Sequence, residues 1–145
     1  MSTHAPGSER KRLLVRVLTP EGPVYEGPAA MVVAPSVLGE VGILPRHTPL
    51  IADLRVGDTR ITTPEDEKVV IASTRGHLAV EEDQVLILCE QAERADAIDR
   101  SRAEEALRRA EEALSAAGDD EAARTRAESA RMRAENRLRA VDKLK

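Results

Sequence analysis

Short apolar runs separated by turn-forming residues fill the first two thirds of the chain. The runs cover residues 13–18, 30–34, 69–72, 78–80 and 85–89. Proline and glycine punctuate them, as at Pro20, Gly22 and Pro35, which is typical of turns. Runs of this length and spacing predict an antiparallel β-sandwich or barrel rather than βαβ units. Several runs are apolar on both faces, which predicts that a second sheet or a partner covers their outer side.

The last third has a different period. Alanines recur at steps of three and four, and a single glycine, Gly118, interrupts them before Asp119 and Asp120. Glycine ends helices and aspartate begins them, so we expect two antiparallel helices joined by a tight turn. The aligned apolar positions are Ala103, Ala106, Ala110, Ala113, Ala117, Ala123, Ala127, Ala130, Ala134, Leu138 and Val141.

The pattern as a whole predicts an α+β fold, in which an N-terminal antiparallel β-sandwich is followed by a C-terminal two-helix hairpin. We expect a flexible tail at residues 1–12, a sandwich domain at 13–93 and a hairpin domain at 94–145. The aligned alanines would form a narrow apolar seam between the two helices. Alanine methyl groups bury little area, so this seam does little to fix one helix against the other. We therefore expect a hairpin that is helical but easily detached.

Charge differs between the two arms of the expected hairpin. Residues 95–118 carry four Arg against six acidic residues, a net charge of −2, whereas residues 122–145 carry six Arg and two Lys against three acidic residues, a net charge of +5. The arms attract each other, and an extended second arm would suit an acidic protein surface. A solvated helix face with charge pairs along it explains the same pattern.

Composition excludes several classes of function. The chain has 145 residues, a formal net charge of −4, one tyrosine and neither Phe nor Trp, so a general nucleic-acid binder is disfavoured. One cysteine, Cys89, rules out an intrachain disulfide, and its apolar surroundings predict a buried structural thiol. No apolar run approaches the roughly 20 residues that cross a bilayer, and the polar start lacks a signal-peptide core. We expect a soluble, cytoplasmic protein.

The residues that could carry catalysis lack the necessary context. No Gly-x-x-x-x-Gly-Lys loop is present, and Gly39 and Gly42 are followed by Pro45 rather than by a helix, which disfavours nucleotide binding through a glycine-rich loop. The histidines lack the spacing of zinc ligands, and the serines lack a nucleophile elbow. These residues are His4, His47, His77, Ser36 and Ser73. The sequence predicts a protein that is not an enzyme and holds no metal.

Four stretches together resemble a known family. Residues 19–27 read Thr-Pro-Glu-Gly-Pro-Val-Tyr-Glu-Gly, and residues 39–49 read Gly-Glu-Val-Gly-Ile-Leu-Pro-Arg-His-Thr-Pro. The other two are Gly-His-Leu-Ala-Val at 76–80 and Ile-Asp-Arg-Ser-Arg-Ala at 98–103. In this order they resemble the ε subunit of bacterial F-type ATP synthase over about residues 13–141. Family members usually have glycine where Arg46 and Arg75 stand and Phe near Leu78, whereas Tyr25 fits.

The segment at 39–49 also has a physical interpretation of its own. Gly39 and Gly42 permit positive φ or close backbone approach, and Pro45 and Pro49 stiffen the backbone after them. We therefore expect a stiff, compact loop between strands, suited to a docking surface. We expect His47 to be a hydrogen-bonded structural residue rather than a proton carrier.

The resemblance implies a non-catalytic rotor subunit of the central stalk of a proton-translocating ATP synthase. Its sandwich would bind the γ subunit and rest on the c-ring, without inserting into the membrane. Its helices would reach the α/β catalytic head and restrain ATP hydrolysis when extended. The protein would lie on the cytoplasmic face of the cell membrane. A free-standing adaptor with a basic helical arm is an alternative, and an RNA-binding helix a more distant one; the latter would use Arg124, Arg126, Arg131, Arg133, Arg137 and Arg139.

The resemblance requires no cofactor but allows a regulatory ATP. Some members bind ATP through an Ile/Leu-Asp-x-x-Arg-Ala motif, which Ile98, Asp99, Arg102 and Ala103 match. Four further charged residues resemble the rest of that site: Glu93, Arg109, Arg133 and Arg137. The guanidinium groups of the three arginines would clamp phosphates. In the simpler alternative, Asp96 caps the helix, Asp99 lies in its first turn and Arg102 is a surface residue.

Overall fold

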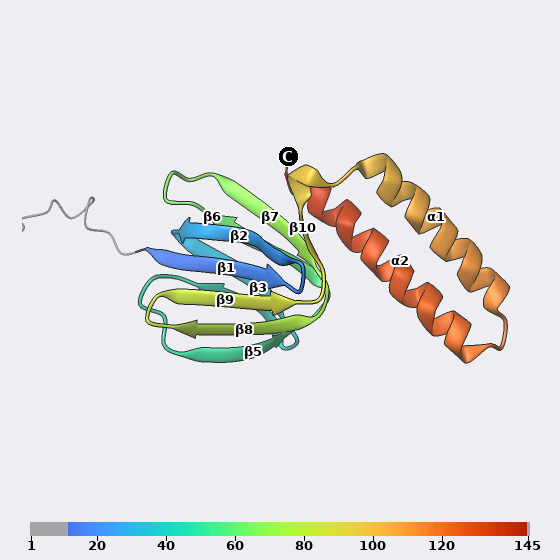
Figure 1. Cartoon of the computed structure of the whole chain (residues 1–145), viewed down its shortest axis with the longest axis horizontal. Coiled ribbons are helices and arrows are strands. Elements are labelled where there is room, and N and C mark those ends of the chain that lie inside the picture. The colour runs from blue at the N-terminus through green and yellow to red at the C-terminus, as the bar shows by residue number, and fades with distance from the viewer. Residues whose placement is uncertain (1–11, 145) are drawn as a thin grey trace, which may run out of the picture.

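The computed structural model of the chain describes residues 12–144. Apart from Arg12, the expected tail at residues 1–12 therefore lies outside the described residues. Within residues 12–144, ten strands precede a short 3₁₀ helix and two α-helices (Figure 1). The strands are β1 (Leu13–Thr19), β2 (Gly22–Ala29), β3 (Met31–Ser36), β4 (Gly39–Ile43), β5 (Leu50–Leu54), β6 (Gly57–Thr62), β7 (Lys68–Ser73), β8 (Gly76–Glu81), β9 (Gln84–Cys89) and β10 (Ala92–Arg94). The helices are η1 (Ala95–Ala97), α1 (Arg100–Ala117) and α2 (Glu121–Asp142).

The strands form one continuous sheet that closes on itself as a sandwich. Its order is β10-β7-β6-β3-β5-β8-β9-β1-β2, and β4 pairs with β3 outside this path. Neighbouring strands are antiparallel except for β1 and β9, which run parallel within the described part of the chain. The predicted α+β class, a β-sandwich followed by two helices, is confirmed.

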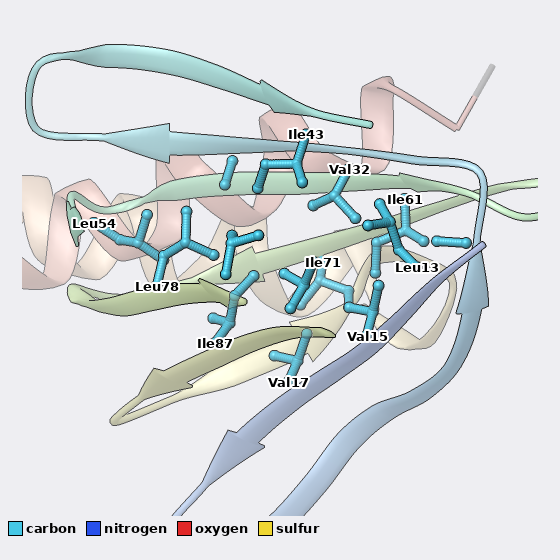
Figure 2. Packing of buried hydrophobic residues seen from close by; sticks show 14 of the residues in the cluster. Leu13, Val15, Val17, Val32, Ile43, Leu54, Ile61, Ile71, Leu78 and Ile87 are labelled. Atoms are coloured by element: carbon cyan, nitrogen blue, oxygen red, sulfur yellow. The ribbon is translucent and has the colours of Figure 1, made fainter. Parts of the chain in front are cut away.

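Aliphatic side chains from opposite strands fill the sandwich (Figure 2). Because successive side chains in a strand point to opposite faces, Leu13, Val15 and Val17 of β1 are buried while the residues between them are exposed. Ile87 of β9 lies beside Val17 and Leu78 of β8 lies beside Ile87 in the same layer, and Val32 of β3 and Ile61 of β6 belong to the same buried cluster. Apart from the partly buried Tyr25, this core is built without aromatic rings.

Two local expectations about the strands are corrected. The run predicted to stop at Pro35 continues to Ser36, which pairs with Gly39 and Leu54. The segment at 39–49, expected to be a loop, begins as strand β4. Gly39 has the anticipated positive φ of 126°. Gly42 does not, and a Cβ there would lie 4.0 Å from the nearest side-chain atom, so it provides no close approach.

The helical hairpin follows the predicted caps. Gly118 ends α1 with a φ of 55°, and the Asp120 side chain accepts a hydrogen bond of 3.1 Å from the amide of Ala123 at the start of α2. Four seam alanines are buried between the helices: Ala103, Ala110, Ala127 and Ala134. The expectation that Asp96 caps α1 is wrong. Asp99 is the N-cap and accepts from the Arg102 amide at 3.2 Å, whereas Asp96 pairs with Arg94.

The hairpin meets the sandwich through the last turns of α2, while its tip at Gly118 points away (Figure 1). α2 lies against β6, β7 and η1. A small apolar cluster forms at this contact from Val70, Ala72, Ala95 and Ala140, with Ile98 beside it. It shares no residue with the cluster inside the sandwich. The two parts of the chain therefore do not have a common interior.

Candidate functional site

The outer face of β6 and β7 is the part of the sandwich that the hairpin covers. Asp58 lies opposite Ala72 and Arg60 opposite Val70, so all four side chains project from the same face. Ala140 of α2 is fully buried against Val70 and Ala72. Several strands were expected to be apolar on both faces, and for β7 the chain's own hairpin covers the outer side. We call these four residues and the hairpin over them the covered face.

A buried amide fastens α2 at the centre of the covered face. Asn136 is 3% exposed, and its Nδ2 donates to the carbonyl of Gly57 at 2.8 Å and to that of Ser73 at 3.4 Å. The Oδ1 of Asn136 and the hydroxyl of Ser73 are buried without a protein partner. A buried polar group is costly unless it is hydrogen-bonded. The amide therefore makes one position of α2 on the sheet preferable to neighbouring ones.

A buried carboxylate receives the end of α2. Asp58 is 6% exposed and accepts from Arg60 Nη1 at 2.9 Å and from Lys143 Nζ at 2.9 Å. Arg60 Nη2 also donates to Glu40 at 3.0 Å. The hydrogen bonds to Glu40 and Asp58 raise the pKa of Arg60 against the opposing effect of burial. Lys143 thereby ties the C-terminal end of the hairpin to β6.

Two further ion pairs surround the contact. Arg137 Nε of α2 donates to Glu93 of β10 at 2.6 Å, and Arg100 at the start of α1 pairs with Asp142 at the end of α2. All four side chains keep partial contact with solvent, so each pair contributes little on its own. Together with Asn136 and Lys143 they make the contact between α2 and the sandwich mainly polar. We call this contact the junction.

The outer face of β5, β8, β9 and β1 has no other part of residues 12–144 over it and carries exposed apolar side chains. Ile51, Ala79 and Leu86 lie in one row across three strands, and Asp53, His77 and Leu88 lie in the next. Ile51 is 85% exposed and Leu88 43% exposed. The polar residues Asp53 and His77 pair with each other at 3.0 Å. We call the surface of Ile51, Ala79, Leu86, Leu88 and Leu14 the exposed face; Leu14 is likewise exposed.

A hollow and an apolar turn adjoin the exposed face. The hollow has a volume of about 1030 Å³ and lies at the strand ends, with Leu18, Val37, Leu54 and Leu88 among its apolar walls. Arg55, Arg75 and Glu90 are among its polar residues. The turn between β3 and β4 carries Val37 and Leu38, and Leu38 is 96% exposed. Apolar surface thus continues from the sheet to one end of the sandwich.

The turn after β4 is held to the β8–β9 turn. Arg46 has a φ of 71°, and its amide donates to Asp83 Oδ1 at 2.6 Å. Glu82 and Asp83 also have positive φ, as a tight hairpin turn requires. This contact was not identified from the sequence. His47 hydrogen-bonds the carbonyl of Thr48 at 2.6 Å, which agrees with the structural role expected for it.

The single cysteine is buried in this fold. Cys89 is 7% exposed at the end of β9. Burial, assisted by the charge of Glu90, raises the pKa of its thiol to about 11. A thiol with this pKa stays protonated at neutral pH and is a poor nucleophile. The predicted buried structural thiol is confirmed.

The eight residues predicted to bind ATP fall into three separate groups. Glu93, Arg133 and Arg137 line one small depression of about 20 Å³ beside Asn136. Ile98, Asp99, Arg102 and Ala103 lie at the start of α1, where Ile98 packs on the small cluster, Ala103 is buried and Arg102 is exposed. Arg109 lies farther along α1 and pairs with Glu105 at 2.7 Å. In this arrangement the pairing partners of Arg137 and Arg109 are carboxylates of the chain itself.

The junction contains functional residues that sequence reasoning missed. Asn136, Asp58, Lys143 and Ala140 were not singled out. Asn136 falls between the seam positions Ala134 and Leu138, so it lies on another face of the helix. An uncharged amide among the charged residues of that face was the one signal that could have indicated a buried partner. Asp58 and Arg60 alternate with Thr59 in a strand whose polar outer residues hid its β period.

Both parts of the chain match models of one known family. Residues 12–95 match the family "ATP synthase, Delta/Epsilon chain, beta-sandwich domain", and residues 96–142 match "ATP synthase, Delta/Epsilon chain, long alpha-helix domain". The chain belongs to the ATP synthase delta/epsilon chain family. The family resemblance seen in the sequence is thereby confirmed.

Curated relatives in this family come from bacteria. The chain is 44% identical over 93 residues to the ATP synthase epsilon chain of Neisseria meningitidis serogroup B, an alignment that covers 63% of this chain and 66% of that protein. It is 48% identical over 95 residues to the ATP synthase epsilon chain of Alkalihalophilus pseudofirmus, covering 66% and 71%. The match thus spans about two thirds of the length of each relative.

Solved structures of ATP synthases contain chains with the same fold. A chain in the Euglena gracilis mitochondrial ATP synthase, in an assembly of OSCP, F1 and c-ring, aligns with a TM-score of 0.76 at 21% identity, covering 86% of this chain and 78% of that one. A chain in the central stalk and c-ring of the Tetrahymena thermophila enzyme aligns with a TM-score of 0.51 at 15% identity, covering 65% and 71%.

Two kinds of feature are absent from residues 12–144. No helix in this range is long and apolar enough to span a bilayer. Within the same range, no three His, Cys, Asp or Glu side chains are grouped as a metal site would require.

Proposed function

We propose that this protein is a non-catalytic rotor subunit in the central stalk of an F-type ATP synthase. Its sandwich would bind the γ subunit through the exposed face and rest on the c-ring through the apolar turn at Val37 and Leu38. The exposed face carries this proposal, because contiguous exposed apolar surface on an otherwise charged protein marks a protein-protein interface. The protein would be peripheral, on the cytoplasmic face of the cell membrane.

The proposed role is mechanical. A rotor subunit must hold its neighbours while torque passes, so it needs broad, well-packed contacts rather than a reactive side chain. A closed sandwich with an aliphatic interior supplies a rigid body. The names of the structural neighbours, which include a c-ring and a central stalk, support this placement.

Binding to partners tests the exposed face. We expect the double variant Ile51→Asp with Leu88→Asp to bind a purified complex of γ and c-ring at least about 100-fold more weakly, since two charges would be desolvated at the interface. Both side chains point outward, so the circular dichroism spectrum and melting temperature should change little. Ser101→Asp with Ser115→Asp adds the same charge at exposed hairpin positions and should bind normally. Failure of the unaltered protein to bind γ would favour a free-standing adaptor instead.

We further propose that the hairpin regulates the complex. Docked on the sandwich it would permit turnover, and extended into the α/β head it would restrain ATP hydrolysis. Two observations support a detachable hairpin, namely the small apolar cluster at Ala140 and the separate interior of the sandwich. A bistable element needs two states of similar free energy.

Truncation tests the regulation. A chain that ends at residue 99 keeps Ala95 and Ile98 over Val70 but lacks both helices. In the assembled complex this chain should give faster ATP hydrolysis while proton pumping stays coupled to it. An unchanged hydrolysis rate would refute a regulatory hairpin, and loss of coupling would refute the separate role of the sandwich.

We also propose that ATP is a regulatory ligand at the junction. The motif at the start of α1 and the grouping of Glu93, Arg133 and Arg137 support this proposal, and the depression of about 20 Å³ between these three residues would have to widen to admit a nucleotide. Phosphate groups would compete with Glu93 for Arg137, so binding would rearrange this pair. Isothermal titration should show that Arg102→Ala binds ATP at least about 10-fold more weakly, as expected for a lost charged contact. Arg124→Ala, at the hairpin tip, is the matched control, and equal affinities for all three proteins would refute the site.

A further inference from the structure

Four alternating charges cross the sandwich surface and end on the hairpin. Glu40 of β4 accepts from Arg60 at 3.0 Å, and Arg60 of β6 donates to Asp58 at 2.9 Å. Asp58 in turn receives Lys143 Nζ at 2.9 Å. Lys143 is the C-cap of α2. Consecutive ion pairs therefore connect an edge strand to the end of the hairpin.

The strand register brings these charges together. Arg60 lies opposite Val33 of β3, and Glu40 lies opposite Pro35 of the same strand. Their side chains therefore approach diagonally across β3. Asp58 and Arg60 are two residues apart on β6 and share a face. The hairpin end arrives over this same face.

Asp58 serves two cations at once. Its Oδ1 accepts from Arg60 Nη1 at 2.9 Å and from Lys143 Nζ at 3.2 Å. Without a further anion, one buried carboxylate would have to balance two positive groups that repel each other. Glu40 supplies the second negative charge and takes the other side of the Arg60 guanidinium.

We propose that Glu40 is a positioning residue for the hairpin, which acts through Arg60 to keep Asp58 available to Lys143. Neutralising Glu40 leaves Arg60 and Lys143 to compete for Asp58, and the end of α2 detaches more often. The coupling is intramolecular, and only its regulatory consequence rests on the proposed function.

The titration of Glu40 agrees with this coupling. The hydrogen bond from Arg60, opposed by slight burial, lowers the pKa of Glu40, and the charge of Lys143 adds to the lowering. Coupling between two sites is reciprocal. If docked Lys143 favours the ionised form of Glu40, ionised Glu40 favours docked Lys143.

Hydrogen exchange on the full chain tests the coupling. The readout is the opening equilibrium of amides in residues 134–142, compared among E40Q, K143Q and the double variant. We expect E40Q to raise opening roughly 3-fold and K143Q roughly 5-fold, as partly exposed ion pairs do. The double variant should match K143Q at roughly 5-fold rather than multiply the two effects to roughly 15-fold, because the two residues act on one link.

Controls distinguish this coupling from a general loss of stability. E26Q breaks the 3.0 Å pair of Arg16 with Glu26 on the exposed side of the sandwich and should leave hairpin exchange unchanged. E40D keeps the charge and should restore part of the effect. The proposal is overturned if E40Q leaves exchange at 134–142 unchanged, if its effect multiplies fully with that of K143Q, or if it raises exchange equally in β1. Because no partner is present, these results do not depend on assembly into an ATP synthase.

Discussion

The sandwich has two outer faces that differ in what lies over them. The covered face uses small side chains, Val70 and Ala72, beneath Ala140, and surrounds them with Asn136 and ion pairs. The exposed face presents larger side chains, such as Ile51 and Leu88, with no part of the described chain over them. One face is fastened mainly by polar groups, and the other is bare and hydrophobic.

This difference separates reversible from lasting contacts. Small apolar residues bury little area, and hydrogen bonds and ion pairs between protein groups can be replaced by hydrogen bonds to water at modest net cost. The covered face therefore suits a hairpin that detaches and docks again. Exposing large aliphatic side chains to water again costs more free energy, because they bury more apolar area. The exposed face therefore suits a partner that stays bound through every rotation. Single substitutions can alter one face while leaving the other intact.

The largest effect is expected at the centre of the covered face. Ala140→Glu places an unpaired charge at a position with 0% exposure, which should raise the opening of the hairpin roughly 1000-fold. Hydrogen exchange of α2 measures this opening, while exchange in β1 should stay slow because the sandwich has its own interior. Met132→Glu adds the same charge at an exposed position on α2 and is the control. If Ala140→Glu unfolds the sandwich with the hairpin, the two parts are one cooperative unit.

The frame of the exposed face is the next target. A Cβ at Gly76 would lie 2.1 Å from the carbonyl oxygen of Leu88 and 2.9 Å from Cys89 Cβ, so β8 and β9 must separate to admit it. We expect Gly76→Ala to lower the free energy of unfolding by about 3 kcal/mol, measured by chemical denaturation. Gly42→Ala is matched, because its nearest contact is 4.0 Å away, and it should change stability by less than about 0.5 kcal/mol. An equal loss of unfolding free energy in the two variants would mean that β8 and β9 can separate at Gly76 without penalty.

Asn136 tests whether polar groups hold the covered face. Asn136→Ala removes the donor to the Gly57 and Ser73 carbonyls and should destabilise docking by about 2 kcal/mol. Exchange of the α2 amides should rise roughly 30-fold. Arg139 is exposed on the same helix, and Arg139→Ala should leave exchange of the α2 amides within about 2-fold of the unaltered protein. A docked state that tolerates Asn136→Ala would show that Ala140 and its neighbours suffice.

The strands and helices differ in how far the sequence could reveal them. Runs with an apolar period, such as those of β1, β8 and β9, were predicted, as were the caps at Gly118 and Asp120. Edge strands were missed because they carry glycine or proline, as β2 does at Pro23 and Pro28. β6 was missed for a different reason. Its outer residues are polar, because Asp58 accepts from Lys143 of the hairpin and Arg60 pairs with Asp58 and Glu40. These polar residues hid the alternating pattern of the strand.

The candidate site was predictable only where a motif carries it. The start of α1 could be identified because Ile98 to Ala103 form a recognisable string. The docking contacts of Asn136, Asp58 and Lys143 join residues up to 85 positions apart, and a single sequence gives no register between them. The exposed face needed the strand pairing, since Ile51 and Leu88 become neighbours only through β8.

Arg46 provides the smallest and most local test. Its φ of 71° is a conformation that side chains with a Cβ resist, and it stands where the family usually has glycine. Arg46→Gly should raise the free energy of unfolding by about 0.5–1 kcal/mol, since relief of strain exceeds the added entropy of the unfolded chain. The hydrogen bond from this amide to Asp83 would remain, so neither outer face should change. Arg75→Gly is the matched control, because Arg75 replaces another usual glycine but has no positive φ. There the same substitution should bring no gain in stability, and a gain at both positions would show that the side-chain charge, rather than the backbone, is the cause.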